Sequence, residues 1–179
     1  MNRKSTTAKI AVAGLFIACA VAGSLISFPL FGSKCSPVQH LVNVLSAILL
    51  GPGYGVGCAF AASLLRNLMG LGTLLAFPGS MIGALVCGLI YKYSRKILPT
   101  LIGEIVGTGI LGGMCAYPIA ILFMGKSAAE IGFFVYVVPF LISTVVGSII
   151  AGILVYSLKG AGVLGKMQHS LGMKVKVKK

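Results

Sequence analysis

The sequence predicts an all-α integral membrane protein in which six transmembrane helices form a compact bundle. Of its 179 residues, 58% are hydrophobic and only 9% are charged, whereas a soluble domain carries about 25% charged residues. The charges leave long uncharged windows, and each window reaches the roughly 20 residues that a bilayer-spanning helix needs. The short segments of alternating polarity that a transmembrane β-barrel would show are missing. The windows cover residues 10–33, 35–65, 67–91, 105–125 and 131–158.

The window at 35–65 is long enough for one long helix or two short ones. Three glycines and a proline lie between Gly51 and Gly55, and this composition favours a turn over a continuous helix. We therefore expect two helices in this window. No loop is long enough to bury a core of its own, so residues 1–179 form a single membrane domain with a basic cytoplasmic tail at 159–179. The expected spans are 8–28, 37–51, 54–70, 79–98, 100–124 and 132–158.

The basic residues predict the orientation of these spans. With six spans and a cytoplasmic N-terminus, most lysines and arginines lie on the cytoplasmic side, as the positive-inside rule requires. A five-span topology would place the C-terminal lysines and the cluster at 92–96 on opposite sides. We expect a multi-pass protein of the cell membrane with both termini in the cytoplasm. The outer side keeps Lys34, Arg66 and Lys126; the inner side has Arg3, Lys4, Lys9, Lys92, Arg95, Lys96, Lys159, Lys166, Lys174, Lys176, Lys178 and Lys179.

A cleaved signal peptide is the alternative interpretation of the first span. Arg3 and Lys4 precede an apolar run that contains Ala18-Cys19-Ala20, which is similar to a cleavage site. The apolar run continues through Leu30, however, and is longer than a typical signal sequence. Its removal would also leave an odd number of spans, which contradicts the charge distribution.

The net charge of +13 does not indicate a nucleic-acid-binding protein. The basic residues lie between spans, and the chain has no tryptophan and no RNA-binding motif. The C-terminal lysines could contact anionic lipid, but a solvated tail that fixes the topology is the favoured interpretation. The five cysteines form no CxxC pair and lie mostly within spans, so we infer neither a metal site nor a disulfide.

Two patterns similar to nucleotide-binding motifs lack the required context. Gly125-Lys126-Ser127 resembles the end of a P-loop, but Ala120 stands where the leading glycine belongs. The segment Gly107–Gly112 matches G-x-G-x-x-G within a span, which indicates helix packing. Without an ATP site or other cofactor site in this chain, active transport would require a partner ATPase or an ion gradient. The chain also lacks aspartate and a paired set of glutamates, so we do not expect an enzyme.

Polar side chains at membrane depth predict the binding site, because an unpaired polar group there costs several kcal/mol. Most of them lie near the outer ends of the expected spans or in the loop Gly70–Ser80, together with a few aromatic residues. This distribution predicts an outward-facing polar and aromatic pocket. The candidate residues are Gln39, His40, Asn43, Arg66, Asn67, Thr73, Phe77, Ser80, Tyr117, Tyr136 and Ser143.

Glu104 and Thr108 lie one helical turn apart and deeper toward the cytoplasm. Two interpretations of Glu104 stay open: an interfacial carboxylate close to Pro99, or a hydrogen-bond acceptor at the floor of the pocket that partners a buried cation. His40 is interpreted as a hydrogen-bonding residue, because one histidine beside a glutamine and an asparagine is a poor metal site.

Gly14, Ala18 and Ala22 form a ladder of small residues on the first helix. Small residues at this spacing let membrane helices approach closely. The ladder could therefore serve packing within the bundle or docking on another membrane subunit, and the residues by themselves favour neither.

Several short strings are spread along the chain: Pro37-Val38-Gln39-His40 with Asn43, Gly51-Pro52, Arg66-Asn67 with Gly70, the run from Gly72 to Ser80, Gly103-Glu104 with Gly107-Thr108-Gly109, Tyr117-Pro118, and Pro139-Phe140 with Ser143. Together they resemble the ThiW family, whose members are substrate-binding S components of energy-coupling factor (ECF) transporters linked to the thiazole precursor of thiamine. The resemblance extends from about residue 8 to residue 158, and its most specific part is the segment Arg66–Ser80.

This resemblance implies a subunit that captures hydroxyethylthiazole, a small neutral heteroaromatic alcohol, from outside the cell. It would dock on a transmembrane coupling subunit driven by two ATPase subunits, through the ladder on the first helix. Phe77 or Tyr117 would contact the ring, and the loops at 29–38 and 70–80 would close over the ligand. The sequence shows no strong charge inside the expected pocket, which argues against a phosphorylated substrate.

Two other functions stay open. A stand-alone secondary carrier or channel would also need a pocket, although such carriers often show internal repeats and this chain has no convincing one. A membrane scaffold without transport activity would tolerate alanine at Asn43, Asn67 and Glu104 without loss of ligand binding. The sequence does not separate the thiazole from thiamine or a related pyrimidine.

Overall fold

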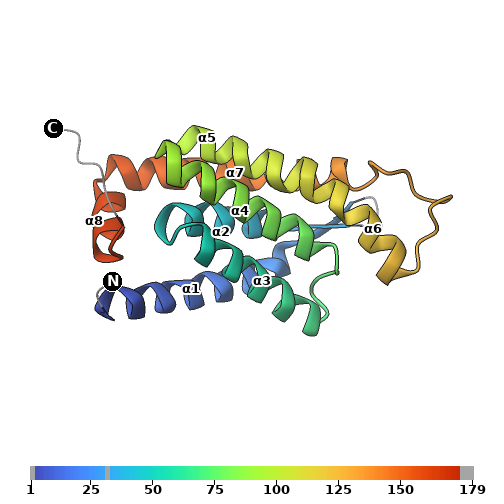
Figure 1. Cartoon of the computed structure of the whole chain (residues 1–179), viewed down its shortest axis with the longest axis horizontal. Helices are drawn as coiled ribbons and strands as arrows, with labels where there is room; N and C mark the ends of the chain where they lie inside the picture. The colour runs from blue at the N-terminus through green and yellow to red at the C-terminus, as the bar shows by residue number, and fades with distance from the viewer. Residues whose placement is uncertain (1–2, 31–32, 174–179) are drawn as a thin grey trace.

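The protein is a bundle of helices with a small β-hairpin at one end (Figure 1). The computed structural model describes residues 3–30 and 33–173. The lysines on which a lipid-binding tail would depend, Lys174, Lys176, Lys178 and Lys179, lie outside the described residues.

Each expected span contains a helix. In the part of the chain that the structure describes, three helical stretches are long and apolar enough to cross a membrane, namely Ser5–Ile26, Ile97–Met124 and Val137–Gly160. The other helices are shorter or less apolar; α2, for example, has 13 residues and spans about 20 Å at 1.5 Å per residue. The helices are α1 (Arg3–Gly23), α2 (Pro37–Leu49), α3 (Pro52–Leu68), α4 (Ala76–Ser94), the continuous run of α5 (Ile97–Glu104), the π-helix η2 (Ile105–Gly112) and α6 (Gly113–Met124), and α7 (Val137–Gly160).

The predicted break in the window at 35–65 is confirmed. Helix α2 ends at Leu49, and Gly51 adopts a φ of 90° before α3 begins at Pro52. A positive φ is strained for residues with a side chain and free of strain for glycine. Proline is favoured in the first turn of a helix because its missing N–H would have no partner there.

The first span ends earlier than the sequence predicts. Helix α1 stops at Gly23, a short 3-10 helix η1 (Ser24–Ile26) follows, and β1 (Phe28–Leu30) then pairs antiparallel with β2 (Ser33–Cys35) to form the hairpin. We expected a span to residue 28 and a loop at 29–38; the described part of this segment contains strand residues that the sequence did not predict. The apolar run continues through this region, and hydropathy does not distinguish a helix from a short apolar strand.

The tail at 159–179 contains a helix that the sequence did not predict. Helix α8 (Val163–Ser170) follows α7, and its Leu164 is buried in the core. The buried Gln168 donates hydrogen bonds from Nε2 to the carbonyl of Ile48 at 3.1 Å and to the hydroxyl of Tyr91 at 2.8 Å. These bonds fasten α8 across the ends of α2 and α4.

The helices form three layers in Figure 1. Helices α2 and α4 lie in the middle, α1 and α3 on one side, and the α5–η2–α6 run with α7 on the other. Both ends of the described chain lie at one end of the bundle, and the hairpin lies at the opposite end.

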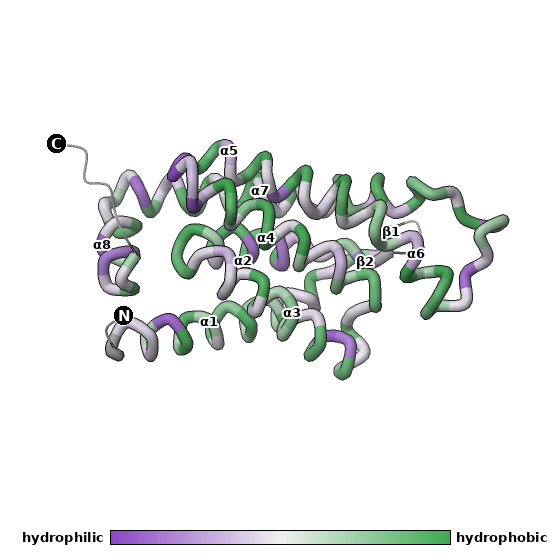
Figure 2. Tube along the Cα trace, in the orientation of Figure 1, coloured by the Kyte–Doolittle hydropathy of each residue, from purple (hydrophilic) through white to green (hydrophobic). Residues whose placement is uncertain are grey.

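The outer surface of the bundle is apolar. Figure 2 shows hydrophobic stretches along most helices, and large side chains such as Leu25 (72% exposed) and Ile153 (65% exposed) point away from the core. A soluble protein rarely exposes so much contiguous apolar surface, whereas lipid-facing helices do.

Glycines allow close contact between α4 and η2. A Cβ built on Gly112 would lie 2.6 Å from the Cα of Gly79, and one on Gly107 would lie 3.0 Å from the Cα of Gly83. The interpretation of the G-x-G-x-x-G pattern as a packing surface is confirmed. This contact sets the distance between two walls of the site described next.

Candidate functional site

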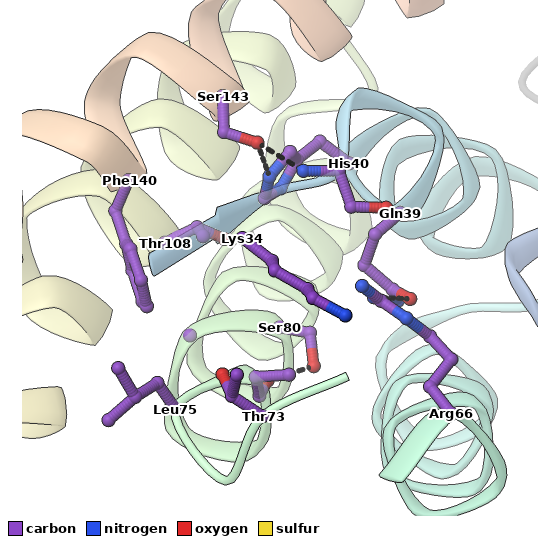
Figure 3. Close-up of a pocket in the computed structure, with 13 residues that line it drawn as sticks. Lys34, Gln39, His40, Arg66, Thr73, Leu75, Ser80, Thr108, Phe140 and Ser143 are labelled. Atoms are coloured by element: carbon purple, nitrogen blue, oxygen red, sulfur yellow. Dashed lines mark hydrogen bonds between the residues drawn. The ribbon is translucent and has the colours of Figure 1, made fainter. Parts of the chain in front are cut away.

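A pocket opens beside the hairpin (Figure 3), and the hairpin lies away from both ends of the described chain (Figure 1). Its empty space measures about 450 Å³, a figure that includes open solvent at the mouth. The ends of several helices meet here, so residues far apart in the sequence share one cavity. The lining residues are Lys34, Ser36, Gln39, His40, Arg66, Thr73, Leu75, Ala76, Gly79, Ser80, Thr108, Phe140 and Ser143.

Glu104 lies beneath this pocket and has no exposed surface. Its Oε1 accepts hydrogen bonds from Asn43 Nδ2 at 2.9 Å and from Thr108 Oγ1 at 2.8 Å, and it pairs with His40 Nδ1 at 3.1 Å. The interpretation of Glu104 as an interfacial carboxylate is therefore wrong. The carboxylate is the acceptor on which three polar side chains from α2 and η2 converge.

One hydrogen-bond chain connects Glu104 to the hairpin. Because the carboxylate accepts from His40 Nδ1, that nitrogen carries a proton. In a neutral ring, Nε2 then accepts from the hydroxyl of Ser143, 3.0 Å away. The same hydroxyl oxygen accepts from the backbone N–H of Ser36 at 3.0 Å. This series of hydrogen bonds fixes the His40 ring at the pocket wall in one orientation.

A second chain connects Glu104 to the last turn of α3. Arg66 Nη1 donates to Gln39 Oε1 at 3.3 Å, and Gln39 Nε2 donates to Asn43 Oδ1 at 3.2 Å. Asn43 Nδ2 then bonds Glu104 and also the carbonyl of Ser80 at 3.2 Å. Asn43 thus joins α2, α4 and α5 below the pocket, and the amide of Gln39 holds the guanidinium of Arg66 toward the cavity.

The hairpin and the loop after α3 meet over the pocket. Lys34 Nζ lies 3.4 Å from the carbonyl oxygens of both Gly70 and Leu71. Cys35 anchors the hairpin, because its thiol donates to the carbonyl of Pro139 at 3.3 Å. Burial raises the pKa of the Cys35 thiol, and a hydrogen bond with Ser143 partly offsets this effect. The thiol therefore stays protonated and available as a donor at neutral pH.

Asn67 holds the loop after α3, at residues 70–75, and does not itself line the pocket. Its Nδ2 donates to the carbonyls of Ser63 at 2.8 Å and Thr73 at 3.1 Å. These two bonds fold the segment at 70–75 back onto α3, with Gly70 at a φ of 70° in the turn.

We expect Asn67→Ala to loosen this segment. Loss of two hydrogen bonds should lower the free energy of unfolding by about 1–2 kcal/mol and speed hydrogen exchange of the amides in residues 70–75. Hydrogen-exchange mass spectrometry in detergent measures the second effect. Ser127→Ala, which removes one exposed hydrogen bond to the Ala129 N–H in another loop, should leave these amides unchanged. Equal protection in the two variants would contradict this role of Asn67.

The structure gathers most of the predicted polar residues at the cavity and puts the predicted aromatic residues elsewhere. Phe77 contacts Phe60 with ring centroids 5.7 Å apart, and Tyr117 contacts Phe133 at 5.1 Å. The predicted residues that line the pocket are Gln39, His40, Arg66, Thr73, Ser80, Thr108 and Ser143; those that do not are Asn43, Asn67, Phe77, Glu104, Tyr117 and Tyr136.

Phe140 provides the aromatic surface of the pocket; the sequence named it in a family-like string but not among the candidate binding residues. It lies on α7 one turn before Ser143, and this i, i+3 spacing could have identified it once Ser143 was chosen. Tyr136 is buried instead in a small apolar cluster with Leu75 and Phe140. Lys34 was missed because it belongs to the hairpin that the sequence did not predict, and Ser36, which was also missed, directly follows that hairpin at the start of α2.

Comparison with known proteins gives one match. The chain matches the family model described as "Thiamine-precursor transporter protein (ThiW)" over residues 10–161. No curated protein and no solved structure matches it. The matched range contains α2 to α7 and most of α1, and therefore every residue that lines the pocket. The chain belongs to the ThiW family of thiamine-precursor transporters.

Proposed function

We propose that this protein is the substrate-capture (S) component of an ECF-type importer and binds a thiamine precursor from outside the cell. The observation that carries the proposal is the pocket of a transporter-family chain, built from polar groups and one aromatic ring, at the end of the bundle away from both ends of the described chain. The resemblance to S components gives hydroxyethylthiazole as the first candidate ligand.

The pocket offers the groups that a small heteroaromatic ligand needs. Phe140 and Leu75 give an apolar surface for the ring. Ser36 Oγ is buried in the pocket wall and has no hydrogen-bond partner within the protein, so a ligand can satisfy it without breaking an internal bond. His40 and Gln39 present further polar atoms held in place by the chains described above.

The helix ends that lie together at each end of the bundle support a topology of six spans with a cytoplasmic N-terminus. The N-terminal end of α1, the junction of α4 with α5, and α8 lie together at the end opposite the pocket (Figure 1). The basic residues Lys92, Arg95, Lys96 and Lys166 belong to these segments. By the positive-inside rule this end faces the cytoplasm, and the pocket then faces outward.

Helix α1 is the proposed docking surface for a transmembrane coupling subunit. Gly14, Ala18 and Ala22 are all exposed, and a Cβ built on Gly14 meets nothing within 4 Å. The ladder therefore does not serve packing within this bundle. Two partner ATPase subunits would supply ATP hydrolysis.

Binding to the purified protein alone in detergent tests the proposal. We expect calorimetric titration with hydroxyethylthiazole to show saturable binding, with thiamine and hydroxymethylpyrimidine as competitors. Ser36→Ala and Phe140→Leu should weaken binding by about 10-fold or more, since each removes a direct contact. Phe77→Leu is the matched control, because Phe77 lies near the pocket without lining it.

Two results would contradict the proposal. A folded protein that binds none of the three compounds would not be a thiamine-precursor capture subunit, and a scaffold role would then be favoured. Uptake of the ligand into proteoliposomes that contain this chain alone would instead indicate a secondary carrier.

A further inference from the structure

Arg66 presents a buried positive charge without a counter-ion. The residue is only 2% exposed, and its hydrogen bond to Gln39 Oε1 goes to a neutral amide. Its Nε has no partner. Among the residues that the structure describes, the close contact between an acidic and a basic side chain is that of Glu104 with His40, and none involves Arg66. A buried charge without a partner is costly, so this guanidinium is built for a group that the protein itself does not contain.

A second cation reaches into the same pocket from the hairpin. Figure 3 shows Lys34 extending across the cavity toward the side where Arg66 lies. The two carbonyls nearest its Nζ are both at 3.4 Å, which is long for a bond from an ammonium group. Two cations that line one small cavity repel each other unless an anion lies between them.

Glu104 does not supply that anion. Its Oε1 accepts from Asn43, Thr108 and His40, and its Oε2 has no hydrogen-bond partner within the described part of the protein. Arg66 is connected to this carboxylate only through Gln39 and Asn43. It also lies below the cavity and is not part of the lining. The pocket lining therefore presents two permanent cations and no carboxylate of its own.

We propose that the pocket selects a thiamine precursor carrying an anionic group, which Arg66 and Lys34 bind while the ring contacts Phe140. Arginine presents a planar fork of donors that matches two oxygens of a carboxylate or of a phosphate, and its unpartnered Nε is one side of that fork. The inference rests on the proposed function and replaces the neutral alcohol as preferred ligand. The expectation that the pocket contains no strong charge is wrong, because both cations line it.

A matched series of ligands tests this inference by calorimetry on the full chain in detergent. The series is hydroxyethylthiazole, its phosphate ester, and the same thiazole with a carboxymethyl group in place of hydroxyethyl. We expect at least one anionic compound to bind about 10-fold or more tightly than the alcohol, and the better of the two identifies carboxylate or phosphate as the bound group.

Three variants test the assignment of the two cations. Arg66→Gln should reduce the affinity for the anion by about 30-fold or more and lower the ratio of anion affinity to alcohol affinity. Lys34→Gln should give a smaller loss of anion affinity. Because Lys34 is exposed, this substitution does not disturb a buried site. Lys126→Gln removes an exposed cation that does not line the pocket and should change neither affinity.

The outcomes separate this inference from the proposed function. If the alcohol binds as tightly as both anions, and Arg66→Gln and Lys34→Gln leave the ratio unchanged, the anionic preference is wrong and the capture function stands. If no thiazole compound binds to the folded protein, the proposed function itself fails, and the inference fails with it.

Discussion

Replacing Glu104 with alanine is expected to abolish ligand binding and to lower the free energy of unfolding by about 3–5 kcal/mol. The substitution leaves three buried donors without their acceptor, on His40, Asn43 and Thr108. Each of these groups would keep its desolvation cost and lose its bond. Both hydrogen-bond chains would lose their common end, so the side chains of the pocket wall would no longer be held in one arrangement.

Thermal unfolding in detergent, followed by ligand titration of the variant, measures the two effects of Glu104→Ala. Glu130→Ala is the matched control, because Glu130 is the other acidic residue of the chain and is exposed. The stability and ligand affinity of Glu104→Gln should lie between those of Glu104→Ala and Glu130→Ala. An amide oxygen still accepts hydrogen bonds, although the carboxylate charge is lost. Equal stability of Glu104→Ala and Glu130→Ala would show that the buried network is not a structural centre.

Gly112→Ala is the second substitution with a large expected effect. The added Cβ would lie 2.6 Å from the Cα of Gly79, and a backbone atom cannot move aside as a flexible side chain can. Overpacking of this kind costs about 1–3 kcal/mol. Because Gly79 lines the pocket, separating η2 from α4 should also widen the cavity and weaken ligand binding.

Gly57→Ala provides the control for this prediction. A Cβ on Gly57 meets nothing within 4 Å, and alanine is favoured over glycine within a helix by about 1 kcal/mol. We therefore expect unchanged or slightly raised stability and unchanged binding. The melting temperatures and ligand affinities of both variants in the same detergent decide the comparison. If Gly112→Ala were as stable as Gly57→Ala, the close contact of α4 and η2 would not limit the packing.

Local chemistry was sufficient to predict the helical segments and the break between α2 and α3. The break at Gly51 and Pro52 follows from the backbone preferences of two residues and needs no tertiary contact. The hairpin at 28–35 and helix α8 depend on such contacts. The hairpin is anchored on α7 through Cys35, and α8 is fastened by Gln168 to residues of α2 and α4. Hydropathy along the chain contains no information about these anchors.

The polar part of the site was predicted better than its aromatic part. A polar residue within an apolar span stands out, because membrane burial makes it costly, and this signal identified Gln39, Arg66 and Ser143. An aromatic residue is apolar whether it faces lipid or the core, so its position in a span does not indicate which of the two it faces. The sequence therefore favoured Phe77 and Tyr117, whereas the rotation of α7 brings Phe140 to the cavity.

The sequence by itself determined the class of the protein, its helical segments and its membership in a transporter family, since hydropathy, glycine and proline positions and motif strings are all local. Only the tertiary structure decided which polar groups meet. His40 and Glu104, which are 64 positions apart, form one pair, and Arg66 and Lys34 share one cavity. The physical reason is that helix rotation and crossing are set by packing between helices, through contacts such as that of Gly112 with Gly79, which no single segment specifies.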